Sequence, residues 1–417
     1  MISRYEGISP RSDIVLIERL CEKLRGKTFL HVNSTKAGGG VAEILQRMVP
    51  LLGDLGIETR WEVITGDDKF FDMTKKVHNA LQGSAEAISD DMWDHYGEVN
   101  RGNAARLDLD ADAVLIHDPQ PAPLVEYRRG GRWFWRCHID ISSPNREVYS
   151  KIDPYVREYD LAIFSVAKFA RAAAVEEFIV PPSIDPLSEK NMELDEDEVK
   201  EIARKFDIPL DRPIILQVSR FDRFKDPIGV INAFRMVKKY NDCVLVLAGS
   251  PATDDPEGAV VLREVQEHAA GDPDIRILLI PPFSDRDINA LQRMATIVLQ
   301  KSLKEGFGLT VSEAMWKGKP VIGGAVGGIP LQIVHGVTGF LVHSAEGAAF
   351  RIRQFLNNPL MAARMGEKGR EFVRKHFLLT RETRDYLALW YSAECRGVGE
   401  VFEIDPPKQT FTGLKSR

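Results

Sequence analysis

Cysteine is scarce in this sequence of 417 residues, which has only Cys21, Cys137, Cys243 and Cys395. No two of them have the C-x-x-C spacing of a zinc site, and their density is too low for a disulfide framework, so a reducing compartment is expected. Long apolar runs are also missing: no stretch reaches the length of about 18 apolar residues that is needed to span a bilayer. The N-terminal MISRYEGISPRSD has no apolar core of signal-peptide length. We therefore expect a cytoplasmic protein that does not enter a membrane.

Charge of one sign does not dominate the sequence either. It has 55 basic and 61 acidic residues, which give a formal net charge of −6. This mildly acidic balance argues against a nucleic-acid-binding surface and against an anionic-membrane surface. Small molecules are the expected partners, and a homodimer is left open. The hydrophobic content of 44% over this length is enough for two α/β domains of ordinary size.

Short apolar runs alternate with helical patterns in both halves of the chain, which is typical of parallel βα units. In the first half, strands are predicted at 28–32, 114–117, 133–139 and 161–166. In the second half, strands are predicted at 214–219, 244–248, 275–280, 297–300 and 320–322. Three prolines within the segment 180–186 interrupt both periodicities, so the domain boundary is expected there. The sequence predicts an α/β protein with two doubly wound, Rossmann-like domains, residues 1–182 and 183–380.

The segment KEGFGLTVSEA places Glu305 and Glu313 on either side of a glycine-containing loop and a helix start. The N–H groups at a helix N-terminus favour a phosphate, and Gly306 and Gly308 let the backbone approach a ligand closely. Ionised carboxylates accept hydrogen bonds from vicinal hydroxyls, which offers Glu305 to a sugar and Glu313 to another diol. The alternative interpretation is a helix-capping loop with two solvated glutamates.

Two further clusters follow predicted strands. Arg220 and Lys225 lie at the carboxyl end of a strand, where doubly wound folds collect ligands, and two cations there could neutralise a diphosphate. A pair of surface cations is the alternative. The glycine-rich loop 36–40, KAGGG, separates the first strand from its helix, and a plain tight turn is its alternative. Its departure from G-x-G-x-x-G, with no acidic residue ending the next strand, argues against a dinucleotide site and hence against a nicotinamide oxidoreductase.

Together, the three clusters resemble the retaining glycosyltransferases of family 4, which have the GT-B fold of two Rossmann-like domains facing each other across a cleft. The resemblance covers nearly the whole chain. It implies that Arg220 and Lys225 bind the diphosphate of the donor, that Glu305 contacts the donor hexose and that Glu313 holds the ribose. It also implies that C-terminal helices, about residues 381–417, complete the first domain. The remaining donor-binding positions that it implies are Gly39, Gly40, Gly306, Phe307, Gly308 and Leu309.

The N-terminal half is similar to the trehalose glycosyltransferring synthases. The resemblance rests on the segments 31–35 (HVNST), 117–121 (HDPQP) and 136–142 (RCHIDIS). It implies that His138 is an active-site residue near the donor sugar, together with Glu305, Arg220 and Lys225. A histidine buried in the core beside two tryptophans is the alternative for His138. Asp118 and Gln120, at the carboxyl end of a strand, are candidates for the acceptor pocket, and a plain loop is the alternative there.

The resemblance implies a retaining hexosyltransferase that moves glucose from UDP-, ADP- or GDP-glucose to free glucose and makes trehalose. Because no carboxylate pair is arranged as in a retaining glycosidase, we expect front-face attack, with the leaving phosphate taking the proton. No cofactor or metal is expected to be required, since no Asp-x-Asp cluster accompanies the phosphate residues; stimulation by Mg²⁺ is left open. A trehalose phosphorylase, a transferase like sucrose-phosphate synthase and a GT-B UDP-sugar epimerase remain alternatives. A non-catalytic sugar-binding protein is the alternative of another class.

Overall fold

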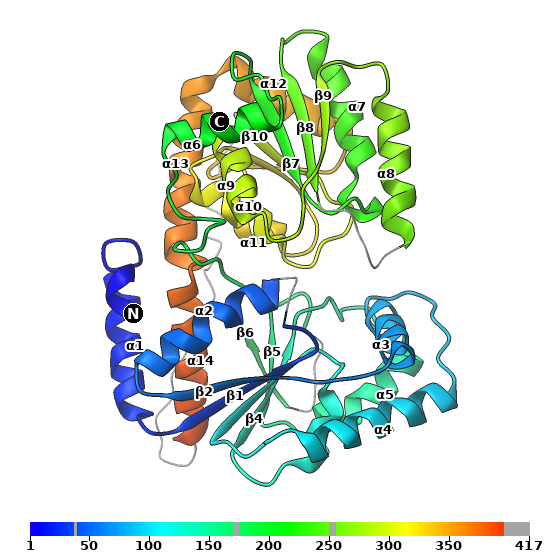
Figure 1. Cartoon of the computed structure of the whole chain (residues 1–417), viewed down its shortest axis with the longest axis vertical. Helices are drawn as coiled ribbons and strands as arrows, with labels where there is room; N and C mark the ends of the chain where they lie inside the picture. The colour runs from blue at the N-terminus through cyan, green and yellow to red at the C-terminus, as the bar shows by residue number, and fades with distance from the viewer. Residues whose placement is uncertain (37–39, 171–174, 250–255, 396–417) are drawn as a thin grey trace, which may run out of the picture. The chain divides into compact units, whose positions relative to one another are not determined.

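The computed structural model describes residues 1–36, 40–170, 175–249 and 256–395. The chain divides into two compact units, which are described separately (Figure 1). Unit 1 consists of Met1–Pro182 with Leu379–Arg417, and unit 2 consists of Ser183–Leu378. Among the described residues, no helix has the length and apolar character needed to cross a membrane.

Unit 1 contains a parallel sheet of six strands in the order β2-β1-β3-β4-β5-β6. The strands are β1 (Thr28–Asn33), β2 (Glu58–Val63), β3 (Ala113–His117), β4 (Arg132–Cys137), β5 (Leu161–Phe164) and β6 (Glu176–Ile179). The chain leaves β1 toward β2 and then returns to the other side of β1 to form β3. The point between β1 and β3, where the direction of winding reverses, is where ligands bind in doubly wound folds.

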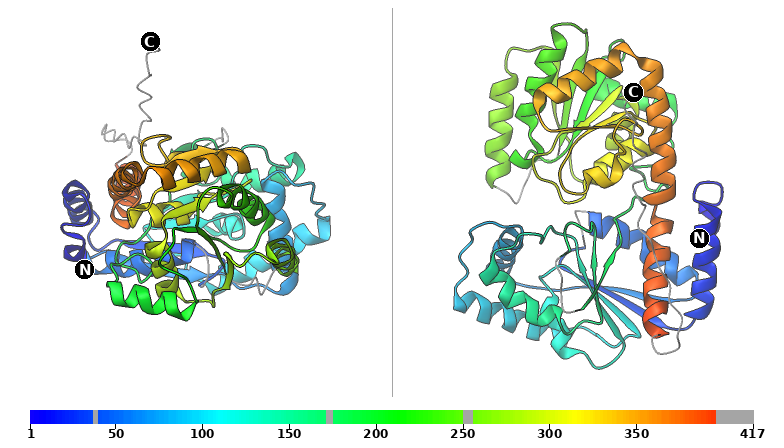
Figure 2. Two further views of the ribbon diagram at one scale, coloured as in Figure 1. Left: turned by 90° about the horizontal axis from the view of Figure 1, so that it is seen from above. Right: turned by 180° about the vertical axis from the view of Figure 1, so that it is seen from behind.

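Helices cover both faces of this sheet (Figures 1 and 2). They are α1 (Arg11–Lys23), α2 (Gly40–Asp54), α3 (Asp68–Leu81), α4 (Asp90–Arg106), α5 (Arg146–Val156) and α14 (Leu379–Glu394). Successive strand residues point to opposite faces, so Leu30 and Val32 join the core formed with α3, α4 and α5. Phe29 points to the opposite face of the sheet, and the centroid of its ring lies 5.1 Å from that of Trp390 in α14. His31 shares that second face.

Unit 2 contains a second six-stranded parallel sheet, in the order β12-β11-β10-β7-β8-β9. The strands are β7 (Ile214–Val218), β8 (Val244–Gly249), β9 (Ile275–Leu279), β10 (Ile297–Gln300), β11 (Val321–Gly324) and β12 (Phe340–Val342). The helices are α6 (Glu196–Lys205), α7 (Pro227–Lys238), α8 (Pro256–Ala269), α9 (Asp285–Met294), α10 (Leu309–Trp316), α11 (Ile329–Gln332), α12 (Ala345–Asn357) and α13 (Pro359–His376). Winding reverses between β7 and β10, so the loops that follow these two strands are the expected ligand site.

The predicted α/β class and its two parallel sheets are confirmed, with differences at strand ends and sheet edges. The strand predicted at 133–139 ends at Cys137, because the backbone N–H of His138 donates to the side chain of Asp118 instead of to a neighbouring strand. The edge strands β6 and β12 were not predicted. The first has two glutamates and is only partly buried, and the second has three residues, so neither gives a clear apolar run.

The helix caps of unit 2 allow a matched test of stability. Ser344 precedes α12 and its Oγ accepts a hydrogen bond of 3.1 Å from the N–H of Gly347, whereas Ser284 precedes α9 without a side-chain cap bond. Ser344→Ala is therefore expected to lower the free energy of unfolding by about 1 kcal/mol. Ser284→Ala should change it by much less. Chemical denaturation of both variants measures the difference, and equal losses would mean that the cap bond contributes nothing.

Candidate active site

The two loops at the winding reversal of unit 2 bring Lys225 and Glu305 together. Lys225 ends the short 3₁₀ helix Arg223–Lys225 after β7, and Glu305 follows β10. The ammonium Nζ lies 2.6 Å from Oε1 and 2.7 Å from Oε2 of the carboxylate. The side chains are 19% and 7% exposed, so this ion pair is largely shielded from water. Two residues predicted from separate clusters thus form one charged centre.

Polar side chains from the two strands hold this pair in place. Gln217 of β7 donates its amide to the carbonyl of Lys225 at 2.8 Å. Ser302 donates its hydroxyl to Oε2 of Glu305 at 3.0 Å, and Gln300 of β10 reaches the same oxygen at 3.4 Å. Sequence reasoning missed these three residues. A signal was present, because a glutamine stands near the end of each of the two otherwise apolar strands, IILQV and IVLQ.

A second ion pair joins the same loops. Lys301, which is buried, pairs with Asp226. Asp226 has φ 52°, a left-handed conformation, and its side chain caps α7 by accepting from the N–H of Gly229 at 3.1 Å. The backbone N–H of Leu303 also donates to the carbonyl of Phe224 at 2.7 Å. These contacts between protein groups fix one loop against the other, which is the preorganisation that binding and catalysis require. Lys301 was not predicted as a site residue.

A second glycine segment, residues 327–328, packs against the loop from Gly306 to Leu309. The N–H of Gly328 donates to the carbonyl of Gly306 at 2.7 Å, and the amide of Gln332 donates to the carbonyl of Phe307. Gly308, the N-cap residue directly before α10, has φ 82°, so a residue without a side chain is favoured there. The predicted glycine loop and helix start are therefore present.

Glu313 is buried on α10 and is not a solvated glutamate. The amide of Gln292, on α9, donates to its Oε2 at 3.2 Å. Lys317, one turn further along, donates to the backbone carbonyl of Glu313 at 3.3 Å and to Oδ1 of Asn191 at 3.0 Å. Burial lowers the pKa of Lys317 to about 7. The alternative of a capping loop with two solvated glutamates therefore does not describe either glutamate.

Arg220 differs from the other predicted donor residues in its exposure. Its side chain is 60% exposed, and Nη2 lies 3.7 Å from a carboxylate oxygen of Asp222. The structure places it in the same loop as Lys225 but gives it an ion pair with Asp222, not with Glu305. Its proposed role in binding a diphosphate stays a prediction.

In unit 1, the predicted acceptor residues Asp118 and Gln120 follow the end of β3. Asp118 has φ 65°, an uncommon conformation for a residue with a side chain, and such strain often accompanies functional sites. Its Oδ1 accepts from the backbone N–H of His138 at 2.8 Å, and its carbonyl accepts from the indole N–H of Trp135 at 3.1 Å. Burial raises the pKa of Asp118 to about 6. Gln120 has a buried amide oxygen with no hydrogen-bond partner among the described residues.

His138 follows β4 and is half-buried, and its ring stacks on that of His117. Its Nε2 lies 3.1 Å from Nδ1 of His117. Burial, helped by the positive charge of Arg136, lowers the pKa of His138 well below its ordinary value. Gly40 is the first residue of α2, whereas Gly39 lies outside the described residues.

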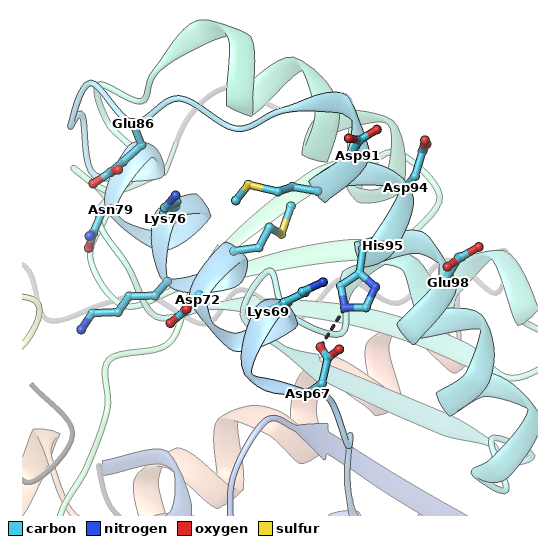
Figure 3. A pocket seen from close by; sticks show the side chains of 13 residues that line it. Asp67, Lys69, Asp72, Lys76, Asn79, Glu86, Asp91, Asp94, His95 and Glu98 are labelled. Carbon is cyan, nitrogen blue, oxygen red and sulfur yellow. Dashed lines mark hydrogen bonds and ion pairs between the residues drawn. The ribbon is translucent and has the colours of Figure 1, made fainter.

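A separate surface cavity of about 940 Å³ lies between α3 and α4 of unit 1 (Figure 3). Side chains of both charges line it, among them Asp67 and Lys69, and the carboxylate of Asp67 lies 2.7 Å from a ring nitrogen of His95. None of the predicted site residues lines this cavity. Among the described residues, no group of three or more His, Cys, Asp or Glu side chains is arranged to hold a metal ion.

Comparisons with known proteins agree with this description. Residues 31–171 match the family model "Trehalose synthase, N-terminal domain", and residues 198–372 match "Glycosyl transferases group 1". The trehalose synthase of Pyrococcus horikoshii is 47% identical over 393 residues, which cover 92% of this chain and 94% of that protein. More distantly, the trehalose phosphorylase of Grifola frondosa is 30% identical over 79% of this chain and 52% of its own length.

Among solved structures, the trehalose 6-phosphate synthase of Burkholderia multivorans superposes with a TM-score of 0.70. The alignment covers 89% of this chain and 99% of that one at 16% identity, so it shows the fold alone. The fold and the matched models define a glycosyltransferase of the GT-B class. The chain belongs to the trehalose synthase family of group 1 glycosyltransferases. This confirms the family resemblance drawn from the sequence.

Proposed function

We propose that the protein transfers glucose, with retention of configuration, from a nucleoside diphosphate-glucose to free glucose and forms trehalose. The observation that carries the proposal is the shielded pair of Lys225 and Glu305 at the winding reversal of unit 2. It places a cation suited to a diphosphate beside a carboxylate suited to sugar hydroxyls. The match of unit 1 to trehalose synthases and not only to general glycosyltransferases supports the acceptor.

The proposed reaction forms one bond to C1 of the glucosyl group, breaks another at the same carbon, and transfers one proton. The acceptor hydroxyl oxygen bonds to C1 of the glucosyl group as the bond from C1 to the phosphate oxygen breaks, and the hydroxyl proton passes to that phosphate oxygen. Negative charge grows on the leaving diphosphate, where the ammonium of Lys225 stabilises it. An ammonium has three N–H donors, so Lys225 can keep its bond to Glu305 while it binds a phosphate oxygen. Arg220 supplies a second cation from the same loop.

The other predicted residues complete the proposal. Glu305 accepts hydrogen bonds from hydroxyls of the donor glucose, and Glu313 accepts them from the ribose. His138 binds near the donor sugar, and Asp118 and Gln120 bind the acceptor.

No metal is assigned to this reaction, and a stimulating effect of Mg²⁺ would act on the diphosphate. The free thiols of Cys21, Cys137 and Cys243 support a reducing cytoplasm as the place of action.

The decisive experiment separates the transferase from its alternatives by product. The protein is incubated with UDP-, ADP- or GDP-glucose and with glucose, glucose 6-phosphate or fructose 6-phosphate, and the products are identified by NMR. Trehalose with release of the nucleotide supports the proposal. A phosphorylated disaccharide would indicate a different acceptor, and a changed sugar nucleotide without an acceptor would indicate an epimerase. Glucose 1-phosphate formed from trehalose and phosphate would indicate a phosphorylase, and binding without turnover a sugar-binding protein.

Glu313→Gln tests the ribose assignment. The substitution keeps the size of the side chain but removes the negative charge, so the charge-assisted hydrogen bonds to the ribose hydroxyls weaken. We expect the affinity for UDP or ADP to fall by about 1–2 kcal/mol, or roughly 5- to 30-fold. Calorimetry measures this loss, with Glu367→Gln, an exposed glutamate of α13, as the matched control. Equal nucleotide affinity for Glu313→Gln and the wild type would remove Glu313 from the ribose site.

A further inference from the structure

Three histidines form a hydrogen-bonded chain on the α14 side of the sheet of unit 1. Nδ1 of His31 lies 3.2 Å from Nε2 of His117, and Nδ1 of His117 lies 3.1 Å from Nε2 of His138. Both pairs of rings are stacked, with interplanar angles of 22° and 12°. The sequence singled out only His138.

The strand register explains why the three rings meet. His31 of β1 is opposite Leu115 of β3, and His117 lies two residues further along β3. His117 is in turn opposite Arg136 of β4, and His138 lies two residues beyond Arg136. A step of two residues returns a side chain to the same face, and diagonal neighbours on adjacent strands are within reach of ring side chains. The chain therefore runs from the buried His31 to the half-buried His138 at the carboxyl edge.

Burial favours the neutral form of all three rings. Burial lowers the pKa of His31 to about 3. Burial also lowers the pKa of His117 and of His138 well below the ordinary value, and the guanidinium of Arg136, itself fully buried, adds to both shifts. Each neutral ring has one N–H group and one nitrogen that only accepts. The two hydrogen bonds must consequently run in the same direction along the chain.

The surroundings of His31, at the buried end of the chain of three histidines, determine the direction of the two hydrogen bonds. Nε2 of His31 is buried and has no hydrogen-bond partner among the described residues. If the bonds ran inward, His31 would carry its hydrogen on this nitrogen, as a buried donor without an acceptor. Buried donors without partners are rarer in proteins than buried acceptors with unused lone pairs. The bonds therefore run outward: His31 donates to His117, His117 donates to Nε2 of His138, and His138 carries its hydrogen on Nδ1.

We propose that His31 and His117 are positioning residues that hold His138 as a neutral hydrogen-bond donor through Nδ1. The proposal rests on the proposed function for its ligand, an oxygen of the nucleotide-sugar. A ring fixed in this form has no free nitrogen to accept the proton of the acceptor hydroxyl. This arrangement of the three histidines therefore suits a reaction in which the leaving phosphate takes that proton and His138 only donates a hydrogen bond.

The first test is independent of activity and substrate. Long-range ¹H–¹⁵N NMR of the full-length protein, labelled at histidine, reports which ring nitrogen carries the hydrogen. The expected result at pH 7 is a hydrogen on Nδ1 of His138, with the three resonances assigned by single replacement of each histidine. A hydrogen on Nε2 of His138, or a doubly protonated ring, would overturn the proposal even if trehalose synthesis were established. The expected tautomer would stand even if the product assay failed.

Two variants at His117 then separate positioning from packing. His117→Phe keeps a flat ring but removes the donor, so His138 should populate both tautomers and turnover should fall by about tenfold or more. His117→Asn offers an amide N–H close to the position of Nδ1 and should restore both the tautomer and most of the turnover. If His117→Phe left His138 with its hydrogen on Nδ1 only, or if His117→Asn rescued neither property in a folded protein, the positioning role would be wrong.

Discussion

Lys225→Ala is expected to lower kcat/KM for the nucleotide-sugar by about 2–4 kcal/mol, or roughly 30- to 1000-fold. The ammonium lies within 2.7 Å of both carboxylate oxygens of Glu305, and the two side chains are largely shielded from water. Its removal deletes the charge that would meet the diphosphate. It also leaves the carboxylate of Glu305, only 7% exposed, without its cation. Donor KM should rise and kcat should fall together, because the diphosphate is bound both in the ground state and in the transition state.

Initial-rate kinetics with the nucleotide-glucose and glucose identified by product NMR measure this effect. Lys239→Ala is the matched control, because Lys239 is an exposed lysine of the same unit. Its kinetics should match those of the wild type. Circular dichroism and thermal unfolding of both variants establish that unit 2 remains folded. Unchanged kinetics in a folded Lys225→Ala protein would remove Lys225 from the site and with it the main support for a diphosphate donor.

The sequence predicted the parts of this fold and site that depend on local patterns. Buried strands such as 214–219 and 297–300 are apolar runs between helical patterns, so their positions could be predicted to within a residue or two. Lys225 was selected because it follows such a strand, and Glu305 because a glycine-containing loop and a helix start come directly after it. Parallel strands end at one edge of a sheet, which is why two residues 80 positions apart meet.

The roles of Lys301, His31 and His117 could not be predicted, because they depend on contacts between distant segments. The ion pair of Lys301 with Asp226 joins positions 75 apart, and nothing in either local sequence identifies the other. His31 and His117 lie in segments that were noted for their family resemblance. Their joint role depends on the diagonal register of three strands, which a linear sequence does not reveal. The edge strand β12 depends on its neighbour β11 for its conformation and lacks a pattern of its own.

Gly327→Ala should destabilise unit 2 and disturb the Glu305 loop, although the proposed reaction assigns Gly327 no role in binding a substrate. It has φ 56°, and a Cβ atom built there would lie 1.9 Å from the carbonyl oxygen of Glu305 and 2.8 Å from that of Gly306. The left-handed backbone costs alanine about 1–2 kcal/mol, and overpacking against a fixed backbone adds about 1–3 kcal/mol. We therefore expect a loss of about 2–5 kcal/mol in the free energy of unfolding.

A glycine with the same backbone conformation but open space around it separates the two contributions. Gly336 has φ 77° and no heavy atom within 4 Å of a built Cβ, so Gly336→Ala should cost only the backbone contribution. Urea unfolding of both variants measures the difference, which we expect to be about 1–3 kcal/mol. Any Gly327→Ala protein that folds must also shift the carbonyl of Glu305, so donor binding should weaken while Gly336→Ala binds normally. Equal stability losses and equal donor affinities would show that the Glu305 loop moves to accommodate the added Cβ at no cost in free energy. The proposal that the 327–328 segment preorganises this loop would then be wrong.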